Sequence, residues 1–102
     1  MVAGDGTVLT LAAARAHLRV TPSYSADDLA PLIAAAEGRV ESFLGRALIE
    51  DAGWTTPAEV PALVVHSVKL ALSDFFVNRE APELSDDQLR PIIGRYMTVS
   101  VA

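Results

Sequence analysis

The stretch "ALVVHSVKLALSDFFVNRE", residues 62–80, follows Pro61 and predicts a helix with two apolar sides. Its main apolar face has the three-and-four spacing of a buried helical stripe and consists of Val64, Val65, Val68, Ala71, Leu72, Phe75 and Phe76. A second, narrower stripe runs through Leu63, Leu70 and Val77 at intervals of seven. A chain of 102 residues has little mass of its own to cover both sides. The narrow stripe therefore predicts contact with another subunit.

A second long helix is predicted for residues 26–45, beginning after Ser25 and ending at Gly45. Its apolar residues form one stripe for burial in the core: Leu29, Leu32, Ile33, Ala36, Val40, Phe43 and Leu44. The opposite side carries small residues, among them Ala34 and Gly38, although glycine inside a helix costs about 1 kcal/mol relative to alanine. Two explanations stay open. Either Gly38 is tolerated at a solvent-facing position, or another helix, from the same chain or a neighbour, approaches closely there.

The remaining segments predict shorter elements. Thr10 is a good N-cap for a helix over residues 11–18, and residues 1–9 are expected to form a loose, flexible arm. Residues 46–60 lack a helical period and predict a loop.

The C-terminal part begins with a capping box formed by Ser85 and Gln88, and Pro91 is expected to divide the region into two short helical turns. Residues 98–102 predict an extended tail, which either adds as a strand to a partner's sheet or frays in the isolated subunit. The chain as a whole, residues 1–102, is therefore expected to be one all-α domain. It would be a small bundle of three main helices with short C-terminal helical turns and an extended tail.

Arg79 lies one turn beyond Phe75 and is predicted to project near the middle of the main apolar face of its helix. A guanidinium is not left unpaired in such surroundings. It either extends outward past the aromatic residues or meets a carboxylate, for which the candidates are Glu37, Glu41 and Glu80. The pair would form within one chain or across a subunit boundary.

The composition argues against several classes of function. Thirteen acidic and eight basic residues give a net charge of −5, whereas nucleic-acid binders normally carry clustered Lys and Arg. The absence of cysteine excludes disulfides and thiolate metal sites. No signal peptide is visible, and no apolar run approaches the roughly 20 residues that span a bilayer. We expect a soluble, cytoplasmic protein with no membrane contact.

No catalytic pattern is apparent. His17 and His66 lie on different predicted helices, in no metal-ligand spacing. The acidic pairs Asp27–Asp28 and Asp86–Asp87 lie near predicted helix termini, where capping and solubility explain them. The sequence therefore predicts no enzyme, no cofactor and no metal.

Three segments resemble, in their order and spacing, the head–tail connector proteins of tailed bacteriophages, also called head-completion, adaptor or DNA-packaging proteins. They are "LTLAAARAHLRV" (9–20), "DDLAPLIAAAEGRVESFLGRALI" (27–49) and "VPALVVHSVKLALSDFFVNREA" (60–81), and "IIGRYM" (92–97) is a weaker fourth. The chain departs from the family pattern at Met97, where many relatives carry arginine.

The resemblance implies an all-α protomer of a homo-oligomeric ring, typically of twelve, beneath the portal. The ring would contact the portal protein on one face and the next connector or tail-completion protein on the other, and DNA would pass passively through it. The protein would belong to the head–tail junction of the virion or prophage particle, after assembly in the host cytoplasm. The expected subunit interface comprises Ala34, Gly38, Leu63, Leu70, Val77, Arg79 and Glu80, and the expected portal contacts are Tyr96, Met97, Val99 and Val101. Because the subunits share a negative charge, we expect a monomer or a mixture of states in dilute solution.

Two other functions remain open. A small cytoplasmic helical regulator that binds a protein or DNA partner would be supported by a basic recognition helix, and none is visible. An enzyme subunit would be supported by a deep pocket with converging polar groups.

Overall fold

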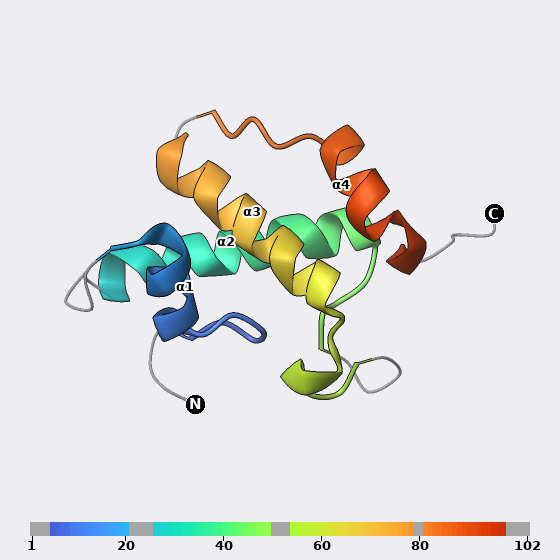
Figure 1. The fold of residues 1–102 in the computed structure, drawn as a ribbon, viewed down its shortest axis with the longest axis horizontal. Coiled ribbons are helices and arrows are strands. Elements are labelled where there is room, and N and C mark those ends of the chain that lie inside the picture. Colours follow the sequence, from blue (N-terminus) through green and yellow to red (C-terminus); the bar gives the residue numbers. More distant parts are fainter. Residues whose placement is uncertain (1–4, 21–25, 50–53, 79–80, 98–102) are drawn as a thin grey trace.

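Four α-helices and two short 3₁₀ turns make up the fold, which the computed structural model describes for residues 5–20, 26–49, 54–78 and 81–97. In chain order the elements are α1 (Leu11–Leu18), α2 (Ala26–Leu44), the turn η1 (Pro57–Glu59), α3 (Ala62–Val77), α4 (Asp86–Ile93) and the turn η2 (Gly94–Tyr96). No strand occurs within these ranges, so the predicted all-α class is confirmed (Figure 1).

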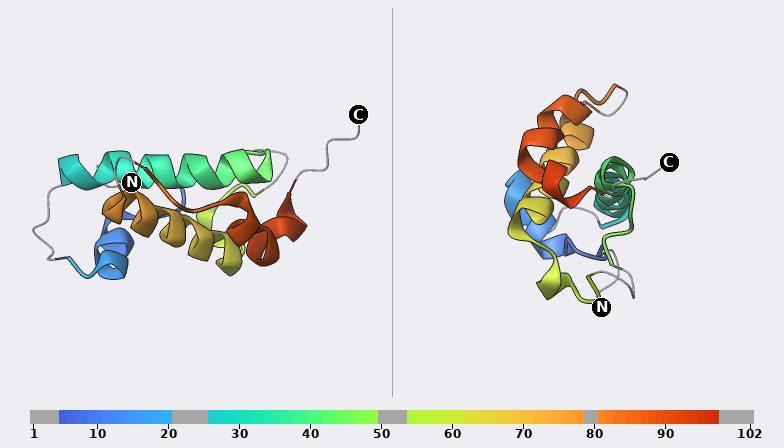
Figure 2. Two further views of the ribbon diagram at one scale, coloured as in Figure 1. Left: turned by 90° about the horizontal axis from the view of Figure 1, so that it is seen from above. Right: turned by 90° about the vertical axis from the view of Figure 1, so that its right-hand side faces the viewer.

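The helices form two layers. α2 lies alone in one layer, and α1, α3 and α4 lie in the other (Figure 2, left). α3 packs along α2 and contacts α1 and α4 at its edges. The molecule measures 46 × 30 × 19 Å, and the shortest dimension runs through the two layers. This arrangement leaves the outer side of α3 and the outer side of α2 facing away from each other.

The core between the layers contains the periodic apolar positions that the sequence predicts. α2 contributes Ile33, Val40 and Phe43, and α3 contributes Val64, Val68 and Leu72, all of which are buried. Leu32 and Phe75 are only partly buried at the margin of this core. Residues from the connecting segments and α4 complete it: Leu9, Leu48, Leu89 and Ile93.

The helix termini follow local signals. The Thr10 side chain accepts a hydrogen bond from the backbone N–H of Ala13 at 3.1 Å, which caps α1 as predicted. Gly45 follows α2 with φ 73°, the left-handed conformation that glycine adopts without steric cost. Ser85 and Gln88 form the predicted capping box at the start of α4.

Two predicted boundaries were wrong. Pro91 does not divide the C-terminal region, because α4 continues through it to Ile93 and a 3₁₀ turn follows. Proline removes one backbone hydrogen bond there, but Leu89 and Ile93 are both completely buried and hold successive turns of α4 against the core. α3 ends at Val77 rather than at residue 80, and Asn78 beyond it has non-helical backbone angles.

The prediction of a loose arm over residues 1–9 was wrong for residues 5–9, because these residues are bound to α2. The carboxylate of Glu37 accepts hydrogen bonds from the backbone N–H groups of Thr7, Val8 and Leu9 at 3.0, 2.8 and 3.0 Å. The Asp5 carboxylate accepts a bond from the N–H of Leu11 at 2.7 Å. Leu9 is buried to 1% exposure, so these residues are part of the fold. Residues 1–4 lie outside the described part of the chain.

Candidate assembly surfaces

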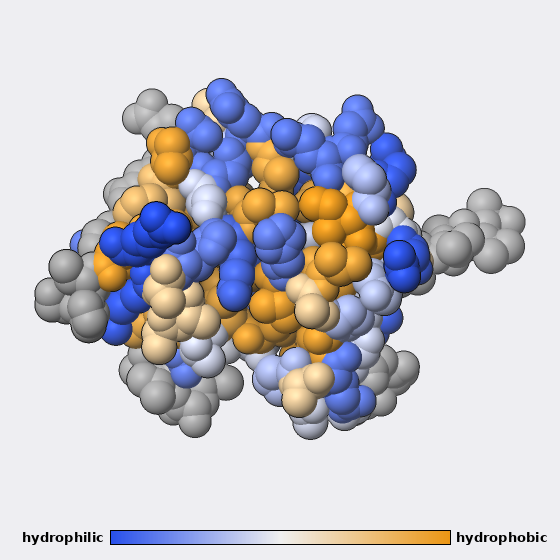
Figure 3. Space-filling view, viewed as in Figure 1, coloured by the Kyte–Doolittle hydropathy of each residue, from blue (hydrophilic) through white to orange (hydrophobic). Residues whose placement is uncertain are grey.

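The outer side of α3 carries the narrow apolar stripe predicted from the sequence. Leu63 is 42% exposed and Val77 is 75% exposed, while Leu70 between them is half-buried. At 1.5 Å per residue, the stripe from Leu63 to Val77 is about 21 Å long. On the face where α3 lies, hydrophobic surface extends across the middle of the molecule, interrupted by polar side chains (Figure 3). The described part of the chain therefore leaves this stripe accessible.

The outer side of α2 carries the small residues. Ala34 and Gly38 are both exposed, and a Cβ atom added to Gly38 would meet nothing within 4 Å. Of the explanations offered for Gly38, close approach of a helix from the same chain is therefore wrong for the residues described. A solvent-facing position and a contact with a neighbouring subunit remain.

These two surfaces lie on opposite sides of the molecule. The core residues of α2, such as Ile33 and Val40, face α3, whereas Gly38 lies on the opposite side of the helix. In the same way, Val64 and Val68 of α3 face α2, and the stripe lies away from it. A contact between the α3 surface of one copy and the α2 surface of another would join two different surfaces.

Of the four predicted portal contacts, the structure describes two. Tyr96 is half-buried and packs on the core, with its ring edge-on to Trp54 at a centroid distance of 5.9 Å. The Arg46 guanidinium lies over the Trp54 ring, 4.1 Å from its centroid. Met97 is 37% exposed at the end of η2. Val99 and Val101 lie outside the described residues. Tyr96 thus fixes the C-terminal turn to its own subunit, and Met97 points outward.

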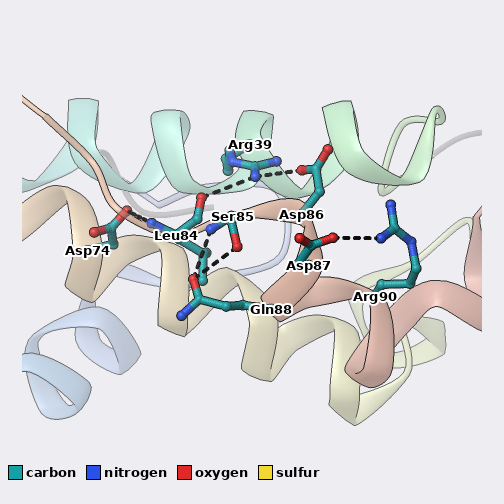
Figure 4. Close-up of polar contacts among 8 residues, drawn as sticks. All are labelled: Arg39, Asp74, Leu84, Ser85, Asp86, Asp87, Gln88 and Arg90. Atoms are coloured by element: carbon teal, nitrogen blue, oxygen red, sulfur yellow. Dashed lines mark hydrogen bonds and ion pairs between the residues drawn. The ribbon is translucent and has the colours of Figure 1, made fainter.

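Arg79 and Glu80, predicted at the subunit interface, also lie outside the described residues, but the segments on either side of them are tied together. The Asp74 carboxylate on α3 accepts hydrogen bonds from the backbone N–H groups of Glu83 and Leu84, each at 2.9 Å, and from the Asn78 amide at 3.1 Å. Part of this network is drawn in Figure 4. A carboxylate is thus placed beside both ends of the α3–α4 connection.

Arg39 on α2 binds the same connection from the other side. Its Nη2 donates to the Leu84 carbonyl oxygen at 3.2 Å and forms an ion pair with Asp86 at 2.6 Å (Figure 4). Sequence reasoning did not identify Asp74 or Arg39. The local signal for Asp74 was an acidic residue within the apolar run of α3, and its backbone partners, Glu83 and Leu84, are nine and ten residues further along the chain.

The pKa of Asp74 is held below its ordinary value of 3.8. Burial acts to raise that pKa, but the hydrogen bonds from Glu83, Leu84 and Asn78, together with the nearby Arg39 charge, outweigh it. Asp74 is therefore ionised throughout the neutral range and holds the α3–α4 connection in place.

Glu37 and Glu41 were candidate partners of Arg79 in the sequence. In the structure their carboxylates bind the chain segments that flank α2 instead. Glu37 holds residues 7–9, and Glu41 accepts a hydrogen bond from the backbone N–H of Leu48 at 2.8 Å. Both glutamates thus fix the segments that enter and leave α2. The sequence did not reveal which polar side chains bind backbone groups distant in the chain, whereas it did predict the apolar core positions.

His17 joins α1 to α3. Its Nε2 lies 2.7 Å from the Ser73 hydroxyl, and burial and the Lys69 charge lower the pKa of His17 below 6.5, with a smaller contribution from His66. These contacts place His17, Lys69 and His66 close together at the outer edge of α3. Lys69 gives this edge of α3 a positive charge, which favours contact with an acidic surface.

Within the described residues, no group of three or more His, Cys, Asp or Glu side chains is placed to hold a metal ion. Among the same residues, no helix has the length and apolarity needed to cross a bilayer. Among the surface hollows that the described residues line, one lies beside Asp74, Glu83, Leu84 and Gln88, and another is lined by Ala12, Arg15, Ala16 and Val20.

Comparisons with protein-family models, curated proteins and solved structures find no match to this chain.

Proposed function

We propose that this protein is a head–tail connector subunit of a tailed bacteriophage or related particle. Copies of it would form a ring beneath the portal, and the ring would receive the next connector or tail-completion protein. Two kinds of support are independent of each other: the ordered sequence segments that resemble the connector family, and the arrangement of exposed apolar side chains on the fold.

The observation that carries the proposal is the exposure of Leu63 and Val77 on α3. Both lie on one apolar row with Leu70, and a row of apolar side chains along one helix is typical of an interaction surface. Subunit contact covers them without adding mass to the chain. A ring also needs two different contact surfaces on each subunit, because one self-complementary surface produces only a closed dimer. The outer sides of α3 and α2 meet that requirement.

The charge of the chain suits a passage for DNA. A net charge of −5 on each subunit would repel the phosphate backbone, whereas a lysine-rich lining would retain it. DNA would therefore pass through the ring without specific binding. Met97, exposed at the end of η2, would be available to a portal or tail partner.

Electron microscopy and mass photometry of the purified protein over a wide concentration range test the proposal. Closed rings are expected at high concentration in the wild type. Val77→Glu should keep its helical circular dichroism, because this side chain is three-quarters exposed, but should form no rings. Ala58→Glu, at an exposed residue of η1, is the matched control and should form rings as the wild type does. A wild type that forms only a tight dimer, or stays monomeric throughout, would contradict the proposal.

A further inference from the structure

The two exposed helix sides differ in shape. The α3 side bears branched side chains that project from Leu63, Leu70 and Val77, and the α2 side bears the small residues Ala34 and Gly38. Projecting side chains of one helix pack into the depressions of another when the second helix has little side-chain bulk there. The shapes of the two sides therefore fit each other better than either fits itself.

The two sides also differ in charge. His66 and Lys69 lie on or beside the α3 stripe, and His66 is exposed. The outer side of α2 begins with Asp27 and Asp28, both exposed in the first turn of the helix. Contact between two α3 sides would bring Lys69 ammonium groups together, and contact between two α2 sides would bring carboxylates together. Contact between an α3 side and an α2 side brings opposite charges together.

We infer that the α3 stripe of one copy packs on the outer side of α2 of the next copy. This inference rests on the proposed ring and specifies the pair of surfaces that builds it. Since α2 and α3 lie in different layers and each of these sides is turned away from the core between them, each copy joined in this way leaves one side of each kind free. Repetition of this contact produces a ring when the rotation between successive copies closes, and an open filament when it does not. The close approach needed at Gly38 also gives a reason for glycine in the middle of α2.

Engineered cysteines test the pairing, because the chain has none of its own. His66→Cys and Gly38→Cys proteins are prepared separately and mixed at ring-forming concentration, then treated with a short bis-maleimide. The mixture should yield a covalent heterodimer, whereas either protein alone should yield little covalent dimer. A chain carrying both substitutions should yield a ladder of oligomers. Ala58→Cys combined with Gly38→Cys is the control and should give no ladder.

The outcomes separate this inference from the proposed function. Rings seen by microscopy together with a His66→Cys homodimer overturn the surface pairing and leave the connector proposal standing. Rings with no ladder when His66→Cys is combined with Gly38→Cys, and none when it is combined with Ala34→Cys, do the same. A protein that forms neither rings nor covalent oligomers at any concentration overturns both. Ala34→Cys in place of Gly38→Cys repeats the test one turn away on α2. A ladder from either position supports the pairing, so loss of contact at one substituted residue does not decide the result.

Discussion

A methyl group added to Gly6 would lie 2.6 Å from both carboxylate oxygens of Glu37. The Glu37 side chain is 6% exposed, and its oxygens are occupied by the N–H groups of residues 7–9 and, at 3.3 Å, by the Thr7 hydroxyl. The carboxylate therefore cannot move aside without losing hydrogen bonds. The Glu37 carboxylate can therefore stay buried at this position only because residue 6 has no side chain.

The first prediction concerns Gly6→Ala. The added methyl group should displace either residues 5–9 or the Glu37 carboxylate, and the free energy of unfolding should fall by about 1 to 3 kcal/mol. Urea denaturation followed by circular dichroism measures this change. Gly38→Ala is the matched control, since nothing lies within 4 Å of the added atom and alanine favours the helix by about 1 kcal/mol. That variant should be more stable than the wild type. Equal stability of Gly6→Ala and wild type would contradict the assigned contact.

The second prediction concerns the charge that binds the N-terminal segment. Glu37→Gln leaves one acceptor oxygen for three N–H groups and turns an amide NH₂ toward at least one of them. We expect a loss of about 2 to 3 kcal/mol, because hydrogen bonds to a charged group are lost and a buried donor is left without an acceptor. Hydrogen exchange of the Val8 and Leu9 amides should accelerate in the variant.

Glu41→Gln provides the comparison for this measurement. Among the described residues, the Glu41 carboxylate accepts one backbone hydrogen bond, from Leu48, which the oxygen of glutamine can still accept. Its loss should stay below about 1 kcal/mol. If both variants lose the same free energy of unfolding, the three backbone hydrogen bonds to Glu37 contribute no more than the one to Glu41. The description of residues 5–9 as bound to α2 would then be wrong.

The contrast between predicted and unpredicted features has a physical basis. The helices over 11–18, 26–44 and 62–77 were predictable, because the spacing of apolar residues, the N-cap Thr10 and the terminating Gly45 are signals that act over a few residues. The polar contacts were not, since Glu37 binds backbone groups some 30 residues earlier in the chain. Any carboxylate can accept such bonds, so no sequence spacing marks the one that does.

The same reasoning applies to the candidate surfaces. The seven-residue spacing of Leu63, Leu70 and Val77 predicted a second apolar side of α3, and the structure leaves it accessible. Whether another copy covers this surface depends on the protein concentration and on the shape of the partner surface. Neither can be read from the spacing of residues in one sequence. The continuation of α4 through Pro91 was likewise decided by tertiary contacts, through the buried Leu89 and Ile93. At the early end of α3, the Asn78 amide binds Asp74, whose carboxylate also accepts hydrogen bonds from Glu83 and Leu84.

The third prediction concerns Asp74, whose ionised form holds the α3–α4 connection. Asp74→Asn should lower the free energy of unfolding by about 1 to 2 kcal/mol at pH 7, since hydrogen bonds to a charged acceptor are lost. Because the pKa of Asp74 is lowered in the folded state, the unfolded chain takes up the proton more readily. The stabilisation is thus complete well above pH 3.8 and is lost as the pH falls through 3.8 toward the lower folded value.

Denaturation of wild type and Asp74→Asn at a series of pH values from 7 to 2.5 checks this dependence. The difference between the two proteins should be constant from pH 7 to about pH 5 and should shrink below pH 3.8. Asp87→Asn, which removes an ion pair between two exposed side chains, is the control and should change stability by less than about 0.5 kcal/mol. A difference that grows on acidification would contradict the lowered pKa.

The fourth prediction concerns His17, which is neutral where it packs between α1 and α3. Burial and the Lys69 charge lower its pKa, against the opposing effect of a hydrogen bond to the Lys69 backbone. Since the folded value lies below 6.5, the unfolded chain protonates first on acidification. The contribution of neutral His17 is therefore complete above pH 6.5 and declines as the pH falls through 6.5 toward the folded value.

NMR titration of the imidazole resonances measures the folded pKa of His17 directly, and a value of 6.5 or above would falsify the prediction. Denaturation at pH 7.5 and pH 5.5 supplies the second readout. Wild type should lose more stability between these values than His17→Gln, because glutamine does not titrate. Ser73→Ala removes the hydroxyl partner of Nε2 but leaves the burial and the Lys69 charge, so it should keep most of the pH dependence while losing about 1 kcal/mol at both values.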